Sequence, residues 1–193
     1  MKKIIVITGN LGSGKSLAAK ILRRKFPCID ADTIVAWTLR RKKEVLRKII
    51  PSAFIGRRVF KKKIAEIIFS NPSLRRRWER VIHDFVFLEF ENWFRNQKGP
   101  CIFIAPLYFE AKRFSARLKS LKVPKFVVLI ASLRTRCLQV AKKKWGLSGA
   151  ARLGLQILPE LASLKSDIVL GNLGSLTEFK KNVMILRELI DVL

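Results

Sequence analysis

The stretch that decides the fold is KIIVITGNLGSGKS, residues 3–16. Its first six residues are a continuous apolar and β-branched run, which is typical of a buried parallel strand. The next eight, GNLGSGKS at residues 9–16, match the pattern G-x-x-x-x-G-K-[ST] at every fixed position. The segment that follows, KSLAAKILRRK, has helical spacing. A strand, a glycine-rich loop and a helix in this order predict a phosphate-binding loop.

The residue types of this loop suit the phosphates of a nucleotide. Its glycines let backbone N–H groups turn inward around phosphate oxygens, and the helix adds the positive end of its dipole. We expect Lys15 to reach the β- and γ-phosphates and the Ser16 hydroxyl to bind Mg²⁺. The predicted ATP-binding residues of the loop are Gly9, Asn10, Leu11, Gly12, Ser13, Gly14, Lys15, Ser16 and Leu17.

The loop alone does not separate a kinase from a GTPase or a motor ATPase. The base-reading motif of GTPases, N-K-x-D, is absent from the chain. No apolar strand ends in the acidic residue of an ordinary Walker B motif, since the run CIFIA leads into Pro106. These absences favour a small-molecule kinase.

Further apolar runs extend the first strand into a sheet. The predicted strands are 3–8, 28–30, 101–105, 125–132 and 167–171. Helical spacing lies between them, at 33–49, 61–69, 73–97, 108–119 and 133–145, with a broken helical region at 149–165. A last helix starts at the capping box Ser175-Leu-Thr-Glu178 and runs to the C-terminus. The alternation predicts an α/β fold of the P-loop NTPase type, with a five-stranded parallel sheet flanked by helices.

The same pattern predicts one domain with two insertions. We expect a nucleotide-binding core of residues 1–32, 98–139 and 157–193, interrupted at 33–97 and at 140–156. The long helix of the first insertion carries a stripe of aromatic residues. Packing in the core or between domains explains that stripe better than base stacking does.

The net charge of +26, from forty Lys and Arg against fourteen Asp and Glu, attracts polyanions. A basic solvated surface explains it equally well, so nucleic acid is expected only as a non-specific electrostatic partner. Three widely spaced cysteines and a single histidine argue against a zinc site and suit a reducing cytosol. No apolar run is long enough to span a bilayer, so we expect a cytoplasmic protein without membrane contact.

Two scarce acidic residues, Asp30 and Asp32, follow the second predicted strand in the sequence PCIDADTIV. Ligands of parallel α/β sheets bind at the carboxyl ends of the strands, where we expect the second strand to end beside the first. Alternate residues of an extended segment share a face, so both carboxylates are expected to look toward the loop. Either residue also suits the N-cap of the next helix.

Beyond the loop, the order of motifs resembles the dephospho-coenzyme A kinase family. That family phosphorylates the ribose 3′-hydroxyl of dephospho-CoA with ATP, the last step of CoA synthesis. The resemblance rests on six ordered segments over nearly the whole chain: ITGNLGSGKS, CIDADTIV, IIFSNPSLRRRWERVIHDFV, IFIAPLYFEAK, Gln156 and the tail Asp167…Asn172-x-Gly174.

The resemblance implies roles for individual residues. Asp32 would be the general base or orienting group for the 3′-hydroxyl, with Lys15 and Lys144 as basic groups at the transferred phosphoryl. Asn172 would join the ATP-binding residues, Ser16 would hold Mg²⁺, and residues 140–156 would form a lid. The implied acceptor-binding residues of the helical insertion and its surroundings are Asp30, Asp32, Lys61, His83, Pro106, Leu107 and Glu110.

The sequence departs from the family pattern at several of these positions. Lys144 stands where family lids usually present Arg, and the lid is about three residues shorter before the Gln. Asp84 replaces the Pro that usually follows the histidine, and Phe60 replaces the Asp before Lys61. His83 alternatively is an ordinary half-buried helical histidine. Glu110 either orients a basic group of the pocket or starts a helix.

Overall fold

Five strands form one parallel sheet. The computed structural model describes residues 1–56, 58–146, 153–154 and 156–193. The strands are β1 (Lys3–Thr8), β2 (Cys28–Asp30), β5 (Pro100–Ile104), β6 (Lys125–Ser132) and β7 (Ile168–Asn172). They lie in the order β2-β5-β1-β6-β7, and each pairing between neighbours is parallel. The predicted α/β fold with a five-stranded parallel sheet is therefore confirmed.

The expectation that β2 lies beside β1 is wrong. β5 lies between β1 and β2, so the second strand does not end directly beside the first. The apolar residues of β5 are almost completely buried, whereas β2 has three residues and only its middle one, Ile29, is buried. A long apolar strand gains more from a central position, and a short, half-exposed strand suits an edge.

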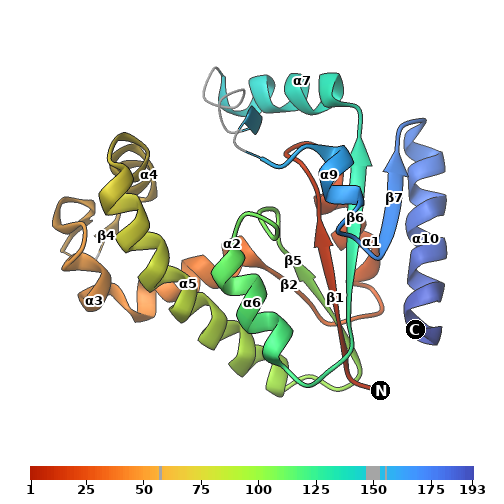
Figure 1. Ribbon diagram of the computed structural model, residues 1–193, viewed down its shortest axis with the longest axis horizontal. Coiled ribbons are helices and arrows are strands. Elements are labelled where there is room, and N and C mark those ends of the chain that lie inside the picture. Colours follow the sequence, from red (N-terminus) through yellow and green to blue (C-terminus); the bar gives the residue numbers. More distant parts are fainter. Residues whose placement is uncertain (57, 147–152, 155) are drawn as a thin grey trace.

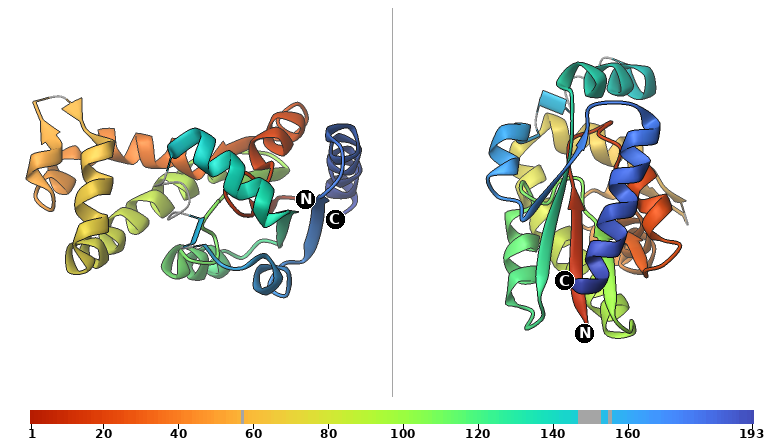
Figure 2. Two further views of the ribbon diagram at one scale, coloured as in Figure 1. Left: turned by 90° about the horizontal axis from the view of Figure 1, so that it is seen from above. Right: turned by 90° about the vertical axis from the view of Figure 1, so that its right-hand side faces the viewer.

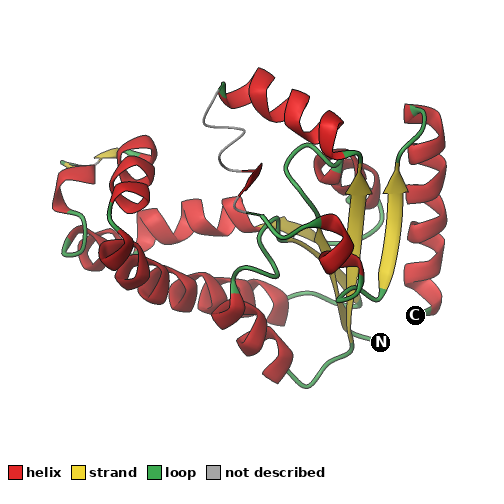
Figure 3. Cartoon of the chain, turned by 45° about the horizontal axis from the view of Figure 1, so that its top comes forward, coloured by secondary structure: helices red, strands yellow, loops and turns green. Residues whose placement is uncertain are grey.

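The carboxyl ends of the strands meet at one end of the sheet, on the side where α7 (Arg134–Trp145) lies (Figure 3). β1 leads there into the loop before α1 (Lys15–Leu22), and β2 ends there at Asp30. The parallel sheet therefore places the phosphate loop and the acidic pair at the same end, although one strand separates them.

Alternate residues of β1 enter two separate hydrophobic cores. Ile5 and Ile7 point to the face covered by α1 and α10 (Leu176–Val192), and Ile4 and Val6 to the opposite face. All four side chains are fully buried. The right-hand view of Figure 2 shows the sheet nearly edge-on between these two layers of helices. Burial on both faces explains why β1 reads as an uninterrupted apolar run.

The second face is covered by α5 (Pro72–Arg95) and α6 (Lys112–Ser120). Phe90 of α5 is completely buried, and its ring lies 4.7 Å from that of Phe103 in β5 and 6.0 Å from that of Phe114 in α6. Trp78 and Phe87 are also buried. The prediction that the aromatic stripe serves packing is confirmed, since its rings join the long helix to the sheet.

The predicted helical insertion extends beyond the sheet, at the left of Figure 1 and in the left-hand view of Figure 2, and its last helix, α5, returns to pack on the sheet. Its elements are α2 (Ala31–Arg41), α3 (Lys43–Arg47), a 3₁₀ turn (Pro51–Ala53), the hairpin strands β3 (Phe54–Ile55) and β4 (Arg58–Val59), α4 (Lys61–Ser70) and α5. The small hairpin is not predicted from the sequence. Two-residue strands are too short to give a recognisable alternation.

The single helix predicted for 33–49 is wrong in extent, because it is two helices. The backbone leaves the helical conformation at Lys42, with φ −107° and ψ 21°, and α3 begins directly afterwards. Leu46 and Ile50, which follow the break, are buried in the core beneath α5. Burying these side chains outweighs the helical preference of the basic run around Lys42.

The remaining elements complete the core. The predicted helix 108–119 begins only at Lys112, because residues 107–110 form a turn in which Ala111 N–H donates to Leu107 C=O. The region predicted as a broken helix contains α9 (Pro159–Ser163) in its described part. The capping box of α10 is confirmed, since Ser175 Oγ accepts from Glu178 N–H at 3.1 Å. Within the described residues, no helix combines the length and apolar character needed to cross a bilayer.

Candidate active site

The phosphate loop depends on glycine at two points of close approach. Gly9 and Gly14 have φ values of 142° and 111°, which side chains rarely tolerate. A Cβ at Gly9 would lie 2.4 Å from the Ile130 carbonyl oxygen, and one at Gly14 would lie 2.7 Å from Asn172 Nδ2. The loop therefore packs directly on β6 and on the end of β7.

Lys15 is buried at the first turn of α1, with 8% of its surface exposed. Its Nζ donates to the carbonyl oxygens of Gly9 and Asn10, both at 2.7 Å. Burial lowers the pKa of Lys15 to about 8, although the nearby carboxylates of Asp30 and Asp32 oppose the shift. Lys15 is therefore a cation held inside the curve of the loop, at the position predicted from the motif.

Two side chains from distant parts of the chain hold the loop in place. Asn172 Nδ2 donates to the Ser13 carbonyl at 2.8 Å, across 159 residues of sequence. Gln156 Oε1 accepts from the Leu11 N–H at 2.8 Å. Asn172 is thus placed as a support of the phosphate loop, and Gln156, from the same family tail, supports it from the other side.

Arg136 is a functional candidate that the sequence does not reveal. It lies in the first turn of α7 and donates to the carbonyl oxygens of Asn172 at 3.1 Å and Gly174 at 3.4 Å. The guanidinium fixes the turn after β7 that carries Asn172. No spacing rule links the two positions, because the contact spans 36 residues.

The acidic pair is arranged differently from the expectation. Asp30 is the N-cap of α2 and its Oδ1 accepts from the Asp32 N–H at 2.8 Å, while Asp32 already lies in the first helical turn. The expected extended conformation from Asp30 to Asp32 is wrong, because the helix begins at Ala31. Capping is nevertheless confirmed for Asp30.

The two carboxylates still share one open space with the phosphate loop. Ser16, Asp30 and Asp32 line a hollow of about 310 Å³, together with Ala19, Lys20, Arg23 and Thr33. Asp32 is exposed, whereas Asp30 is half-buried. Burial raises the pKa of Asp30, and the hydrogen bond from Asp32 N–H opposes that rise. Asp32 is the freer of the two carboxylates to meet a second substrate.

Glu110 does not start a helix, because α6 begins two residues later. Its Oε1 accepts from the Ile157 N–H at 2.7 Å, and its carboxylate acts to raise the pKa of Lys15 against the effect of burial. Glu110 thereby ties the turn after β5 to the residue next to Gln156. Pro106 and Leu107 lie in the same turn, beside the end of β1, because Ala105 N–H donates to Ile7 C=O at 2.9 Å.

The other predicted acceptor residues lie in the insertion. Lys61 is the exposed first residue of α4, and His83 is half-buried within α5. Neither lines the hollow of Ser16 and Asp32. Burial lowers the pKa of His83. The geometry thus brings together the loop, Asn172 and the acidic pair, and leaves Lys61 and His83 on the separate helical wall.

Asp84, which stands where the family pattern has Pro, is bound by two arginines of α6. Its carboxylate accepts from Arg113 Nε and Nη2, both at 2.9 Å, and from Arg117 Nη1 at 3.1 Å. These bonds lower the pKa of Asp84. The departure from the family pattern therefore links α5 to α6.

The predicted lid lies only partly within the described residues. Lys144 is an exposed residue in the last turn of α7. This helix lies above the carboxyl ends of the strands (Figure 1). Residues 147–152 and 155, which belong to the predicted lid and include Arg152, lie outside the described residues.

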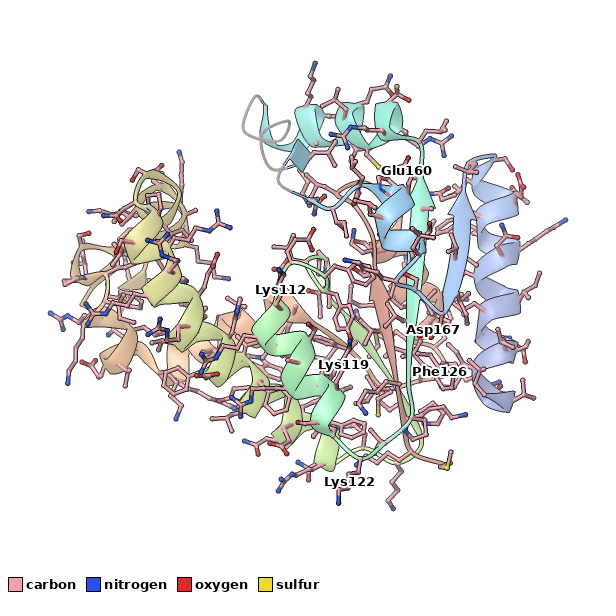
Figure 4. The ribbon with its side chains drawn as sticks, in the orientation of Figure 1. Lys112, Lys119, Lys122, Phe126, Glu160 and Asp167 are labelled. Atoms are coloured by element: carbon pink, nitrogen blue, oxygen red, sulfur yellow. The ribbon has the colours of Figure 1, made fainter. Side chains whose placement is uncertain are left out.

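Asp167 has a structural position far from the loop. Its Oδ2 accepts from the Val127 N–H at 2.7 Å, and its own N–H donates to the Val127 carbonyl at 2.9 Å. Figure 4 labels it at the start of β7, near Phe126 and away from the strands' carboxyl ends. This acidic residue of the family tail therefore sets the register of β6 and β7.

Comparison with known proteins agrees on one family. The family model described as dephospho-CoA kinase matches residues 3–178. A dephospho-CoA kinase of Thermus thermophilus is 32% identical over 183 residues, covering 92% of this chain and 87% of that protein. A Thermus thermophilus crystal structure superposes with a TM-score of 0.80 at 30% identity, covering 97% of this chain and 98% of that one. A Campylobacter jejuni dephospho-CoA kinase gives 0.72 at 21% identity, covering 99% and 98%, which supports the fold.

Proposed function

The chain belongs to the dephospho-CoA kinase family, and we propose how its residues carry out ATP-dependent phosphorylation of the 3′-hydroxyl of dephospho-CoA. One observation carries the assignment of roles. The Ser16 hydroxyl, which follows the phosphate-loop lysine, and the exposed Asp32 carboxylate line the same open hollow. A kinase needs these two groups together, because one side must hold the triphosphate while the other receives the acceptor hydroxyl.

ATP binds with its phosphates in the loop of residues 9–16. Backbone N–H groups and the N-terminus of α1 bind the β- and γ-phosphates, and Lys15 exchanges its carbonyl acceptors for phosphate oxygens. Asn172, Gln156 and Arg136 hold the loop in shape through the bonds described above. A loop already fixed in this form loses little conformational entropy when the nucleotide arrives.

The oxygen groups around Ser16 fit Mg²⁺. The Ser16 hydroxyl would be the protein ligand, and Asp30 and Asp32 in the same hollow would reach the ion through water. When bound with ATP, the ion neutralises charge on the β- and γ-phosphates. This set of donors is typical of a magnesium site, in which few ligands come from the protein.

Asp32 receives the acceptor. Its carboxylate accepts a hydrogen bond from the ribose 3′-hydroxyl and takes that proton as the 3′-oxygen bonds to the γ-phosphorus. The bond from the γ-phosphorus to the β–γ bridging oxygen breaks, and ADP leaves with that oxygen. Asp30 supports this step by capping α2, which sets the position of Asp32.

The wider acceptor site lies between the core and the helical insertion. We assign its core side to Pro106, Leu107 and Glu110, and its helical side to Lys61 and His83. Lys144, in the last turn of α7, adds positive charge toward the transferred phosphoryl group. A lysine provides this charge without the paired geometry of arginine, so we expect weaker stabilisation than a guanidinium would give.

The direct test is product formation. The protein is incubated with ATP, Mg²⁺ and a panel of acceptors that contains dephospho-CoA, AMP, adenosine and shikimate, and products are identified by mass spectrometry. We expect CoA, phosphorylated at the 3′ position, as the dominant product. Phosphorylation of another acceptor without CoA formation would overturn the proposal.

A further inference from the structure

A second hollow adjoins the hollow that Asp32 lines. This second hollow, of about 270 Å³, shares Arg23, Asp30 and Thr33 with the first, and is further lined by Cys28, Ile29, Trp37 and Trp93. We treat these two adjoining hollows as one site, which we call the indole groove. Ser16 and Asp32 line the first hollow, and Trp37 and Trp93 line the second.

The packing of α2 against α5 creates the far end of this groove. Arg41, near the end of α2, forms a salt bridge with the largely buried Glu89 of α5, so the two helices run side by side. Trp37 lies one turn before Arg41, and Trp93 one turn after Glu89. Both indoles are half-buried, so they present apolar surface to the groove without being part of the closed core.

The middle of the groove is basic. Lys20 and Arg23 are exposed residues of α1 and its C-cap, four positions and seven positions beyond Ser16. Within the described part of the chain, neither forms a salt bridge with a carboxylate. Arg23 lies near the Asp30 carboxylate and the Cys28 thiol. Together Lys20 and Arg23 place two cations on one wall, which suits a dianionic group bound between the reaction centre and the indoles.

The chemistry along the groove follows the order of groups in dephospho-CoA. We propose that the indole groove binds the diphosphate and the pantetheine arm of that substrate, a proposal that rests on the proposed function. With the ribose 3′-hydroxyl at Asp32, the diphosphate lies by Lys20 and Arg23, and the arm lies against Trp37 and Trp93. Arg23 and the two tryptophans thereby determine specificity for dephospho-CoA over shorter nucleotides.

The test compares two acceptors on purified full-length variants. One acceptor is dephospho-CoA, and the other is the methyl ester of ADP, which keeps the ribose and diphosphate but has no pantetheine arm. The quantity measured is kcat/KM for each acceptor. Trp37→Leu and Trp93→Leu are expected to lower the preference for dephospho-CoA about tenfold each, because only that acceptor reaches the indoles.

Arg23→Gln changes the part of the groove that both acceptors share. We expect it to lower kcat/KM about tenfold for each acceptor, mostly through KM. Arg24→Gln is the matched control, since Arg24 is the next exposed arginine and does not line the groove. Phe85→Leu is the control for the tryptophans, because Phe85 is a half-buried aromatic residue of α5 outside the groove.

The outcomes separate this proposal from the proposed function. If the unmodified protein makes no CoA, the proposed function fails. If it makes CoA and both tryptophan variants keep the full preference for dephospho-CoA, the indole groove is not the site of the arm. Equal losses for both acceptors in those two variants would also overturn the proposal, since they would show a structural role only.

Discussion

The phosphate loop and the tip of the helical insertion both depend on basic side chains, but they hold them in opposite ways. The loop uses one cation, Lys15, which is buried and donates to two carbonyl oxygens. Residues 40–80 of the insertion carry fifteen Lys and Arg against three Glu. Ten of these basic side chains are exposed and form no salt bridge within the described residues: Arg40, Arg47, Lys48, Arg58, Lys61, Lys62, Lys63, Arg76, Arg77 and Arg80.

The comparison distinguishes a cation that is fixed in one position from cations that only attract anions. Burial lowers the pKa of Lys15 and costs stability, and in exchange the ammonium group is fixed where phosphate must bind. The exposed cations of the tip keep their hydration and their freedom, so each contributes a weak, salt-screened attraction. We therefore expect a large loss of activity when Lys15 is removed and only a small loss when any single cation of the tip is removed. The following experiments test that contrast.

Among the basic side chains, the largest effect is expected from removing the buried cation. Lys15→Ala should lower kcat/KM for ATP about a thousandfold, because it removes the cation that is held inside the curve of the phosphate loop. Steady-state kinetics with varied ATP measures it, and thermal unfolding checks that the fold persists. A loss below tenfold in a folded variant would show that the loop does not depend on one fixed cation.

The next largest effect is expected on stability, from the aromatic packing that joins α5 to the sheet. Phe90→Ala should lower the free energy of unfolding by about 3 kcal/mol, because Phe90 is fully buried among the rings of Phe103 and Phe114. Urea unfolding measures the change. Phe90→Leu is the milder control and should cost less, and equal costs for both variants would contradict a well-packed aromatic core.

The pH dependence of ATP binding should follow the perturbed lysine. The pKa of Lys15 is lowered to about 8, so the free protein loses the ammonium proton as the pH rises through that value. Binding that requires the ammonium form then weakens about tenfold per pH unit above pH 8. Calorimetric titration with ATP between pH 7 and 9.5 measures it. Constant affinity up to pH 9.5 would mean that Lys15 keeps an ordinary pKa.

The smallest effect is expected at the tip. Replacing Lys62 and Lys63 together by Gln should change kcat/KM less than twofold at about 0.15 M salt and stability by less than about 0.5 kcal/mol. The same assays measure both quantities, and kcat/KM at low salt should fall somewhat more. A tenfold loss at 0.15 M salt would assign these exposed lysines a specific contact.

How far the sequence predicts this molecule differs between local and long-range features. The strands and the loop are predictable, because β-branched burial and the G-x-x-x-x-G-K-S pattern are local signals. The position of β5 between β1 and β2 and the break at Lys42 are not, since they depend on which apolar side chains find a shared core.

In the candidate site too, residues in local motifs are predictable and contacts between distant residues are not. Lys15, Ser16 and Asp32 follow from motifs and resemblance. The bond from Ile157 N–H to Glu110 and the bonds from Arg136 to the Asn172 turn join residues tens of positions apart, which no spacing rule connects. The sequence indicates that Asp30 caps a helix, but it does not show that α2 begins at Ala31, between the two aspartates.

The measurement that tests the central claim most directly compares Asp32→Asn with Asp30→Asn. Both variants are assayed for ATP affinity by calorimetry and for phosphoryl transfer to dephospho-CoA in a single turnover. We predict that Asp32→Asn keeps ATP affinity within about threefold and slows transfer by about two to four orders of magnitude. Asp30→Asn, which keeps a capping oxygen, should slow transfer far less. Near-normal transfer by Asp32→Asn would contradict its assignment as the group that receives the 3′-hydroxyl proton.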